Sequence, residues 1–177
     1  MNHAAKLAYR FDVSALAEAE ITPHQKYGKL QKYARGMPGD NFGWQSETKN
    51  ISNADAFIAQ LPAKLVELER PFVFMLELPA AHTKTPVLPV HVDLNKTCGI
   101  NIYLDTNGEV TKFYHWNKEE RISEYEEEFC AQTGDVWLMD TSVPHSVDLV
   151  PGKARSMLTF SFTKTKYHEV LECFTRM

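Results

Sequence analysis

A histidine and an aspartate separated by one residue, His91 and Asp93, are the residues best suited to do chemistry in this sequence. Alternate side chains of a β-strand point to the same side, so the imidazole and the carboxylate would face one point. His145 would complete a set of two imidazoles and one carboxylate if it came from a neighbouring strand. Such a set binds ferrous iron and leaves half of its octahedral coordination open for substrates. We therefore predict that His91, Asp93 and His145 are metal ligands and form the catalytic centre.

Arg155 follows His145 by ten residues and opens a segment rich in strand-forming residues. The planar guanidinium stays charged in a partly buried site and can bind both oxygens of a carboxylate. Alone, Arg155 would equally fit a surface ion pair, and a lone histidine is most often a hydrogen-bonded core residue. The order of the four residues together favours a metal site beside a fixed cation.

With these four residues the chain resembles the 2-oxoglutarate and Fe(II)-dependent dioxygenases. Their pattern is His-x-Asp, a distal histidine, and an arginine or lysine about ten residues later. The resemblance covers residues 71–163 and extends to Gly134–Leu138, which leads to Val143–Val147. Many members carry a serine two residues after the arginine that also contacts the co-substrate, and here that position is Met157. A second anchor for the co-substrate must therefore come from elsewhere.

The resemblance implies a double-stranded β-helix that binds Fe(II), 2-oxoglutarate as co-substrate, and O2. It implies oxidative decarboxylation of 2-oxoglutarate to succinate and carbon dioxide, coupled to hydroxylation of a C–H bond. The substrate would be a small molecule or a peptide side chain. In this reaction the protein contributes ligation, positioning and exclusion of water, while the iron carries the difficult step.

The order of the expected elements predicts the same fold. A helix should start at Thr22-Pro23, where a threonine cap precedes a proline, and end near Gly36. Ser52 should cap another helix, which Pro62 bends or divides. Strands follow, and Thr165 should cap a final helix. The expected strands span residues 72–78, 87–93, 98–104, 109–116, 134–140, 145–149 and 154–162.

This order predicts a mainly β protein with flanking helices, a jelly roll of the cupin-like type. We expect a single domain over residues 1–177. Residues 1–70 should form a helical N-terminal support, 71–163 the β core and 164–177 the C-terminal helix. The helices should pack on the outer face. The charged stretch from 117 to 128 should be a solvated excursion, in part helical.

The dipeptide Asn107-Gly108 is typical of a two-residue hairpin turn. The register that it sets would place Tyr103 opposite Lys112 on a polar and aromatic face. Unpaired buried polar groups are costly, so such an interior favours a bound polar ligand. The predicted interior face carries Gly99, Asn101, Tyr103, Lys112, Tyr114 and Trp116. We predict that Asn101, Tyr103 and Lys112 bind the co-substrate together with Arg155. Tyr114 and Trp116 should border the substrate pocket.

The last expected strand carries a similar polar face, formed by Arg155, Met157, Thr159 and Ser161. A two-residue hairpin at Pro151-Gly152 would place Arg155 and His145 on opposite faces. Both residues can serve one site only if the connection has an odd number of residues or a bulge. We therefore predict an irregular hairpin at Pro151-Gly152.

Composition excludes several classes of protein. The chain has 177 residues, of which 44% are hydrophobic and 24% charged, as is typical of a soluble domain. A net charge of -4 disfavours nucleic acid as a partner. The apolar runs are too short to span a membrane, and the N-terminus lacks the apolar core of a signal peptide. Cys98, Cys130 and Cys173 fit neither a disulfide framework nor a zinc cluster. We expect a cytoplasmic protein, and the sequence carries no signal of its oligomeric state.

Two other functions compete with the dioxygenase. One is a cupin-type metalloprotein that uses iron, manganese or zinc without 2-oxoglutarate. The other is a binding module that has kept the barrel and lost catalysis. Arg155 at its spacing favours the dioxygenase over the first, and the intact ligand set argues against the second.

Overall fold

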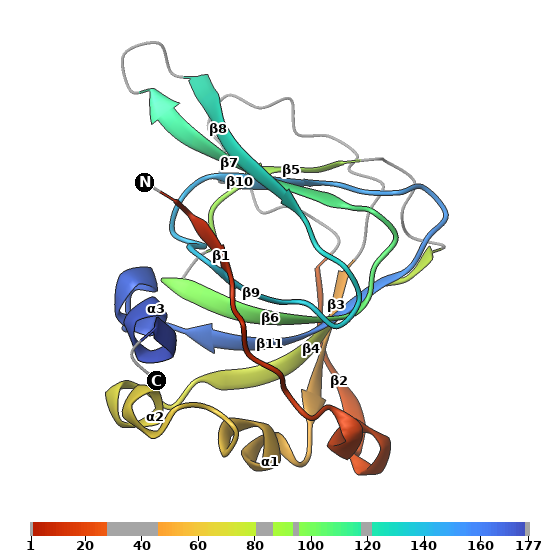
Figure 1. Cartoon of the computed structure of the whole chain (residues 1–177). Helices are drawn as coiled ribbons and strands as arrows, with labels where there is room; N and C mark the ends of the chain where they lie inside the picture. Colours follow the sequence, from red (N-terminus) through yellow and green to blue (C-terminus); the bar gives the residue numbers. More distant parts are fainter. Residues whose placement is uncertain (1, 28–45, 81–86, 94–95, 118–121, 176–177) are drawn as a thin grey trace.

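Strands make up most of the regular secondary structure among the described residues (Figure 1). The computed structural model describes residues 2–27, 46–80, 87–93, 96–117 and 122–175. The strands are β1 Ala4–Lys6, β2 Ile21–Tyr27, β3 Ser46–Ile51, β4 Phe72–Leu78, β5 Val87–His91, β6 Cys98–Asp105, β7 Val110–Asn117, β8 Ile122–Cys130, β9 Val136–Met139, β10 His145–Asp148 and β11 Arg155–Phe162. The helices are the 3-10 helix η1 Ser14–Glu18 and the α-helices α1 Ala54–Ile58, α2 Ala63–Leu68 and α3 Tyr167–Thr175.

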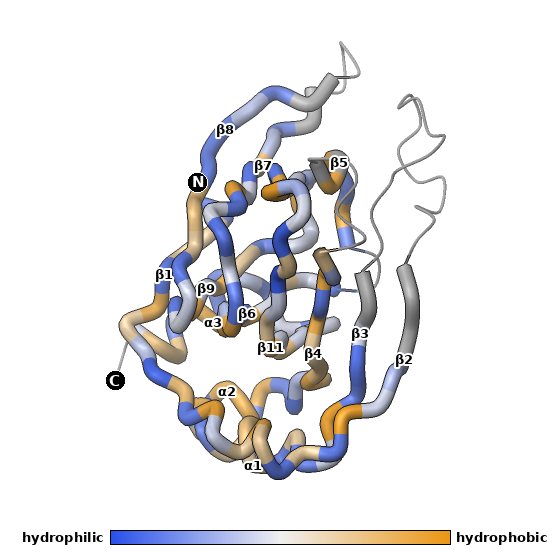
Figure 2. The backbone as a smooth tube through the Cα atoms, turned by 90° about the vertical axis from the view of Figure 1, so that its right-hand side faces the viewer, coloured by the Kyte–Doolittle hydropathy of each residue, from blue (hydrophilic) through white to orange (hydrophobic). Residues whose placement is uncertain are grey.

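Two antiparallel sheets face each other (Figures 1 and 2). Among the described residues, one sheet has the order β1-β9-β6-β11-β4-β3-β2 and the other the order β5-β10-β7-β8. The α-helices lie on the side of the larger sheet that faces away from the smaller one (Figure 1). This arrangement is a double-stranded β-helix, or jelly roll. The predicted mainly β fold, with helices on its outer face, is confirmed.

Alternate residues of the larger sheet pack into two different cores. Ile100 of β6 and Leu158 of β11 pack with the helices, in a cluster that also contains Phe57. Tyr103 and Met157, on the same two strands, pack with aromatic residues of the smaller sheet. Successive side chains of a strand point to opposite faces, so one strand serves both layers. The predicted faces of β6 and β11 are therefore correct.

The turn at Asn107-Gly108 does not form the predicted hairpin. It connects β6 to β7, which lie in different sheets, so the predicted register of Tyr103 opposite Lys112 is wrong. The backbone of Gly108 does take the positive φ of 96° that such a turn favours. The local turn signal is therefore real, but the jelly roll uses the turn to carry the chain from one sheet to the other.

The connection at Pro151-Gly152 behaves in the same way. It joins β10 of the smaller sheet to β11 of the larger one, so the predicted irregular hairpin is also wrong. Gly152 has a φ of 74° at this crossing. The change of sheet removes the difficulty that the irregular hairpin was meant to solve, because Arg155 and His145 now belong to sheets that face each other.

The N-terminal region is less helical than predicted. The predicted helix from Thr22 is wrong where it is described, because Ile21–Tyr27 forms strand β2; its remainder, from residue 28, lies outside the described residues. β2 is the edge of the larger sheet, where a proline is tolerated, and its register shifts between Pro23 and Gln25. Pairing with β3 thus overrides a local capping signal. The division at Pro62 is confirmed, since α1 ends at Ile58 and α2 begins at Ala63.

Within the charged stretch 117–128, residues 118–121 lie outside the described residues, and the part from Ile122 belongs to strand β8, so the predicted helical character is wrong there. β8 pairs with β7 at the edge of the smaller sheet, and Figure 2 shows its hydrophilic character. Phe129 packs inward between the sheets, whereas Glu124, Glu126 and Glu128 are exposed. Successive side chains of a strand point to opposite faces, so the edge strand can bury Phe129 while these glutamates stay in solvent. Within the described residues, no helix is long and apolar enough to span a membrane.

Glu69, just after α2, connects the helical layer to the end of the larger sheet through hydrogen bonds. Its carboxylate accepts backbone hydrogen bonds from Thr163 at 2.8 Å, Lys164 at 3.0 Å and Thr165 at 2.8 Å. Partial burial raises the pKa of Glu69, but these hydrogen bonds outweigh that effect and lower the pKa to about 2. The ionised carboxylate therefore stabilises the connection from β11 to α3.

We expect Glu69→Gln to lower the free energy of unfolding at pH 7 by about 1–2 kcal/mol, because the neutral amide accepts fewer and weaker hydrogen bonds. The folded pKa of about 2 lies below the ordinary value of 4.5, so the advantage of Glu69 is complete above pH 4.5. It should disappear as the pH falls through about 2. Urea denaturation at several pH values measures this difference, with the exposed Glu67→Gln as the control. An equal effect of both substitutions would contradict it.

Candidate metal centre

His91 and His145 stand directly opposite each other on neighbouring strands. They are paired residues of β5 and β10 in the smaller sheet, and their ring centroids are 4.4 Å apart. The register shifts between His145 and Val147, so the strand is irregular just beyond the histidine. The prediction that His145 comes from a strand next to that of His91 is confirmed.

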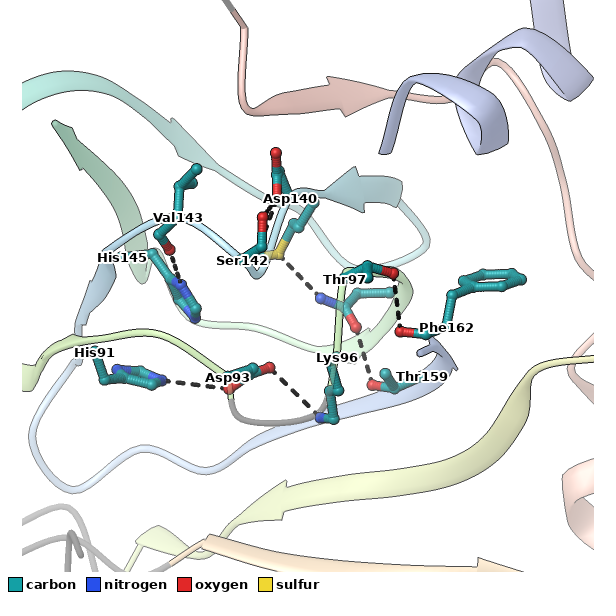
Figure 3. A network of polar contacts seen from close by, with 12 residues as sticks. His91, Asp93, Lys96, Thr97, Asp140, Ser142, Val143, His145, Thr159 and Phe162 are labelled. Carbon is teal, nitrogen blue, oxygen red and sulfur yellow. Dashed lines mark hydrogen bonds and ion pairs between the residues drawn. The ribbon is translucent and has the colours of Figure 1, made fainter. Parts of the chain in front are cut away.

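Asp93 lies two residues beyond the end of β5 rather than within it. Its backbone N–H donates to the carbonyl oxygen of Thr141 at 3.0 Å, which ties it to the segment before β10. Figure 3 shows the side chains of His91, Asp93 and His145 directed toward one another. One donor atom from each of the three lies within 4.8 Å of the other two. The structure therefore brings together the three residues that the sequence predicts as ligands.

The protonation of the cluster suits metal binding. Burial, and then the neighbouring His91, lower the pKa of His145 to about 4, so this imidazole is neutral at pH 7. Its Nδ1–H donates to the carbonyl oxygen of Val143 at 3.0 Å, which leaves Nε2 with its lone pair free to ligate. Burial raises the pKa of Asp93, but Lys96 and the two histidines lower it by more, so the carboxylate is ionised. Two imidazoles and one carboxylate fit a divalent transition-metal ion.

Arg155 is a buried cation on the interior face of the larger sheet. Only 7% of the residue is exposed, and its Nε has no hydrogen-bond partner in the part of the chain that the structure describes. Its guanidinium lies 5.5 Å from the centre of the Tyr103 ring, and Nη2 donates to the Tyr103 hydroxyl at 3.5 Å. Within the described residues, no acidic side chain forms an ion pair with it. A guanidinium in this setting favours an anionic ligand.

The other residues of the predicted interior differ in their partners. Tyr103 is buried, and burial raises its pKa by more than Arg155 lowers it, so its hydroxyl is a neutral donor. Its hydroxyl also lies 3.9 Å from the sulfur of Met139, a weak acceptor. Asn101 accepts from Thr159 at 2.9 Å and donates to Met139 at 3.0 Å. Tyr103 is thus better placed than Asn101 to bind an anion beside Arg155.

The side chains of β7 point in the opposite directions from those predicted. Lys112 points outward and pairs with Asp148 at 2.6 Å, whereas its neighbour Phe113 is fully buried between the sheets. Tyr114 also faces outward, with its hydroxyl 2.9 Å from that of Ser146. The predicted interior placement of Lys112 and Tyr114 is wrong, because it depended on the hairpin register. The side chain of Trp116 lies outside the described residues.

Lys96 is a neighbour of the site that the sequence reasoning missed. Its Nζ lies 3.5 Å from Asp93 Oδ2 and 5.0 Å from the centre of the Phe74 ring. Figure 3 shows it between Asp93 and Thr159. A lysine three residues after the ligand aspartate was the available signal. That spacing alone does not indicate that the lysine lies beside the predicted ligands, because its position depends on contacts with distant strands.

No family model matches the chain, and no curated protein matches it. Among solved structures, the chain is similar to an oxidoreductase of the 2OG-Fe(II) oxygenase family from Burkholderia pseudomallei, at 14% identity and a TM-score of 0.48. The match covers 93% of this chain and 86% of that one. It is also similar to the hazelnut (Corylus avellana) vicilin, at 12% identity and a TM-score of 0.41, over 70% of this chain and 31% of that one.

A third similar structure is a formate complex of oxalate decarboxylase from Lactobacillus farciminis, at 14% identity and a TM-score of 0.39. The match covers 73% of this chain and 32% of that one. At these TM-scores the likenesses carry no argument about chemistry. The interpretation of the site rests on its own geometry.

We expect His91→Ala to reduce the affinity for Mn(II) or Fe(II) by at least about a hundredfold, because it removes one of three protein ligands. Anaerobic calorimetric titration measures the affinity. The added metal should also raise the melting temperature of the wild type but not of the variant. His115→Ala removes an exposed histidine of β7 and is the matched control. Retention of wild-type affinity by His91→Ala would exclude His91 as a ligand.

Proposed function

We propose that the protein is an Fe(II)- and 2-oxoglutarate-dependent dioxygenase that hydroxylates a C–H bond of a small molecule or a peptide side chain. The observation that carries this proposal is the buried guanidinium of Arg155, which forms no ion pair among the described residues and lies inside the same barrel as His91, Asp93 and His145. A metal site alone would fit many reactions. A metal site together with a buried carboxylate receptor favours a reaction with an acidic co-substrate.

His91, Asp93 and His145 would hold the iron through two neutral nitrogens and one carboxylate oxygen. When bound, iron with 2-oxoglutarate and O2 supplies the oxidation of a C–H bond, which no side chain can perform. The protein's own task is to hold the reactants and exclude water. The cluster suits this task because His145 is 5% exposed and Phe113 stacks near it, with ring centroids 6.0 Å apart.

Arg155 and Tyr103 would bind the carboxylate of 2-oxoglutarate that lies far from the metal. The guanidinium offers the charge and the unpaired Nε–H, and the neutral phenol can donate a further hydrogen bond. Tyr103 would thereby take the part of the anchor that Met157 cannot provide. The guanidinium lies over the Tyr103 ring, 5.5 Å from its centre, so the ring offers it a cation–π contact as well.

The test of this function is the anaerobic addition of Fe(II) and then 2-oxoglutarate. Chelation of the iron by 2-oxoglutarate should produce a weak visible charge-transfer band, and admission of O2 should release succinate and carbon dioxide. A cupin-type metalloprotein that does not use 2-oxoglutarate would bind the iron but give neither signal. A binding module without a metal would give no response at all. Absence of both the band and the decarboxylation would overturn the proposal.

We expect Arg155→Ala to spare metal binding and to lower the affinity for 2-oxoglutarate by about tenfold to a hundredfold. The substitution removes a charge-assisted contact in a buried site. Titration of the charge-transfer band measures this affinity. Lys153→Ala removes an exposed cation two residues away and should leave it unchanged. An unchanged affinity in Arg155→Ala would show that the guanidinium does not bind the co-substrate.

A further inference from the structure

A second cation, Lys96, lies beside the ligand cluster on an aromatic surface. Its ammonium is 5.0 Å from the centre of the Phe74 ring, and its side chain is about one-third exposed. Its contact with Asp93, at 3.5 Å, is at the outer limit of a hydrogen bond. Asp93 is also a predicted metal ligand, with its other oxygen 3.8 Å from His91 Nε2. Lys96 therefore has no strong carboxylate partner of its own among the described residues.

Lys96 and Arg155 lie at different levels of the barrel interior. Strand register places Phe74 opposite Thr159 and Leu78 opposite Arg155. Four residues along a strand correspond to about 13 Å. The two cations thus lie beside positions that are well separated along β11. Arg155 is buried, whereas Lys96 is partly accessible. They are placed to bind different anions.

The apolar surface under Lys96 continues outward. Phe72 stacks on Phe74 with ring centroids 5.5 Å apart, and both belong to the interior face of β4. Phe74 is 4% exposed and Phe72 is 51% exposed. Phe74 is thus buried beneath Lys96, and the exposed Phe72 ring is the aromatic surface that a ligand beside this cation can contact.

The charges of the loaded site also favour an anion at Lys96. A divalent ion, Asp93, a dianionic co-substrate and Arg155 together carry no net charge when both histidines are neutral. The ammonium of Lys96 then leaves one positive charge on the accessible side of the interior. A substrate with a single negative charge would neutralise it.

We propose that Lys96 is a specificity-determining residue that binds a carboxylate of the prime substrate, with the apolar body of that substrate lying along the exposed ring of Phe72. The substrate class is accordingly a carboxylic acid with an apolar or aromatic body. This inference rests on the proposed function, because it takes Arg155 and the metal to be occupied by the co-substrate.

The test uses the full chain loaded with Co(II), which does not turn over, and saturated with 2-oxoglutarate. The probes are 3-phenylpropanoate and its uncharged amide, and paramagnetic broadening of their proton NMR signals measures the two affinities. The wild type should bind the acid at least about tenfold more tightly than the amide. Lys96→Met should remove this preference and leave amide binding nearly unchanged. Lys49→Met, which removes a half-buried lysine paired with Glu77, should retain it.

Equal binding of the acid and the amide by the wild type, or binding of neither, would overturn the inference. So would a preference that survives in Lys96→Met. Loss of Co(II) binding in Lys96→Met would instead assign Lys96 to the positioning of Asp93. The visible spectrum of Co(II) reports 2-oxoglutarate binding in the same samples. Failure of 2-oxoglutarate to bind would overturn the proposed function first, whereas its binding without any acid preference would overturn only the role of Lys96.

Discussion

The pairing of His91 with His145 across two strands is the constraint on which the site depends. Imidazoles with centroids 4.4 Å apart repel each other when both are protonated, and burial adds to the cost at His145. His145 is therefore a neutral donor beside the ionised Asp93, which is the state that a metal ion requires of its ligands. The smaller sheet fixes this pairing because β10 lies between β5 and β7. The crossings between the sheets then bring the larger sheet, with Arg155, over it.

The sequence predicted that His91, Asp93 and His145 lie together, because the signals were mostly local. The spacing of His91 and Asp93, and the alternation along β6 and β11, each depend on a few consecutive residues. The partners of each strand depend on the whole fold. Asn107-Gly108 fitted a hairpin, yet the chain crosses to the other sheet there, and this single error turned Lys112 from an expected interior residue into an exterior one.

The N-terminal strands also show that non-local strand pairing can override a local sequence signal. Thr22 and Pro23 carry a helix-start signal, but pairing of β2 with β3 at the edge of the larger sheet determines the outcome. Lys96 is a further case. Its ammonium lies over Phe74 of β4, so its place beside Asp93 follows from non-local packing that no spacing rule contains.

Arg155 stands between two apolar clusters, and this setting gives it its chemical character. Leu78, its partner in register, belongs to a cluster with Leu88 and Val147, while Tyr103 belongs to the other cluster. A buried charge without a counter-ion costs several kcal/mol, and a single aromatic ring offsets only part of that cost. A carboxylate that enters such a site meets little competition from water and gains both charge and hydrogen bonds. The apolar walls therefore strengthen, rather than oppose, the binding of an anion.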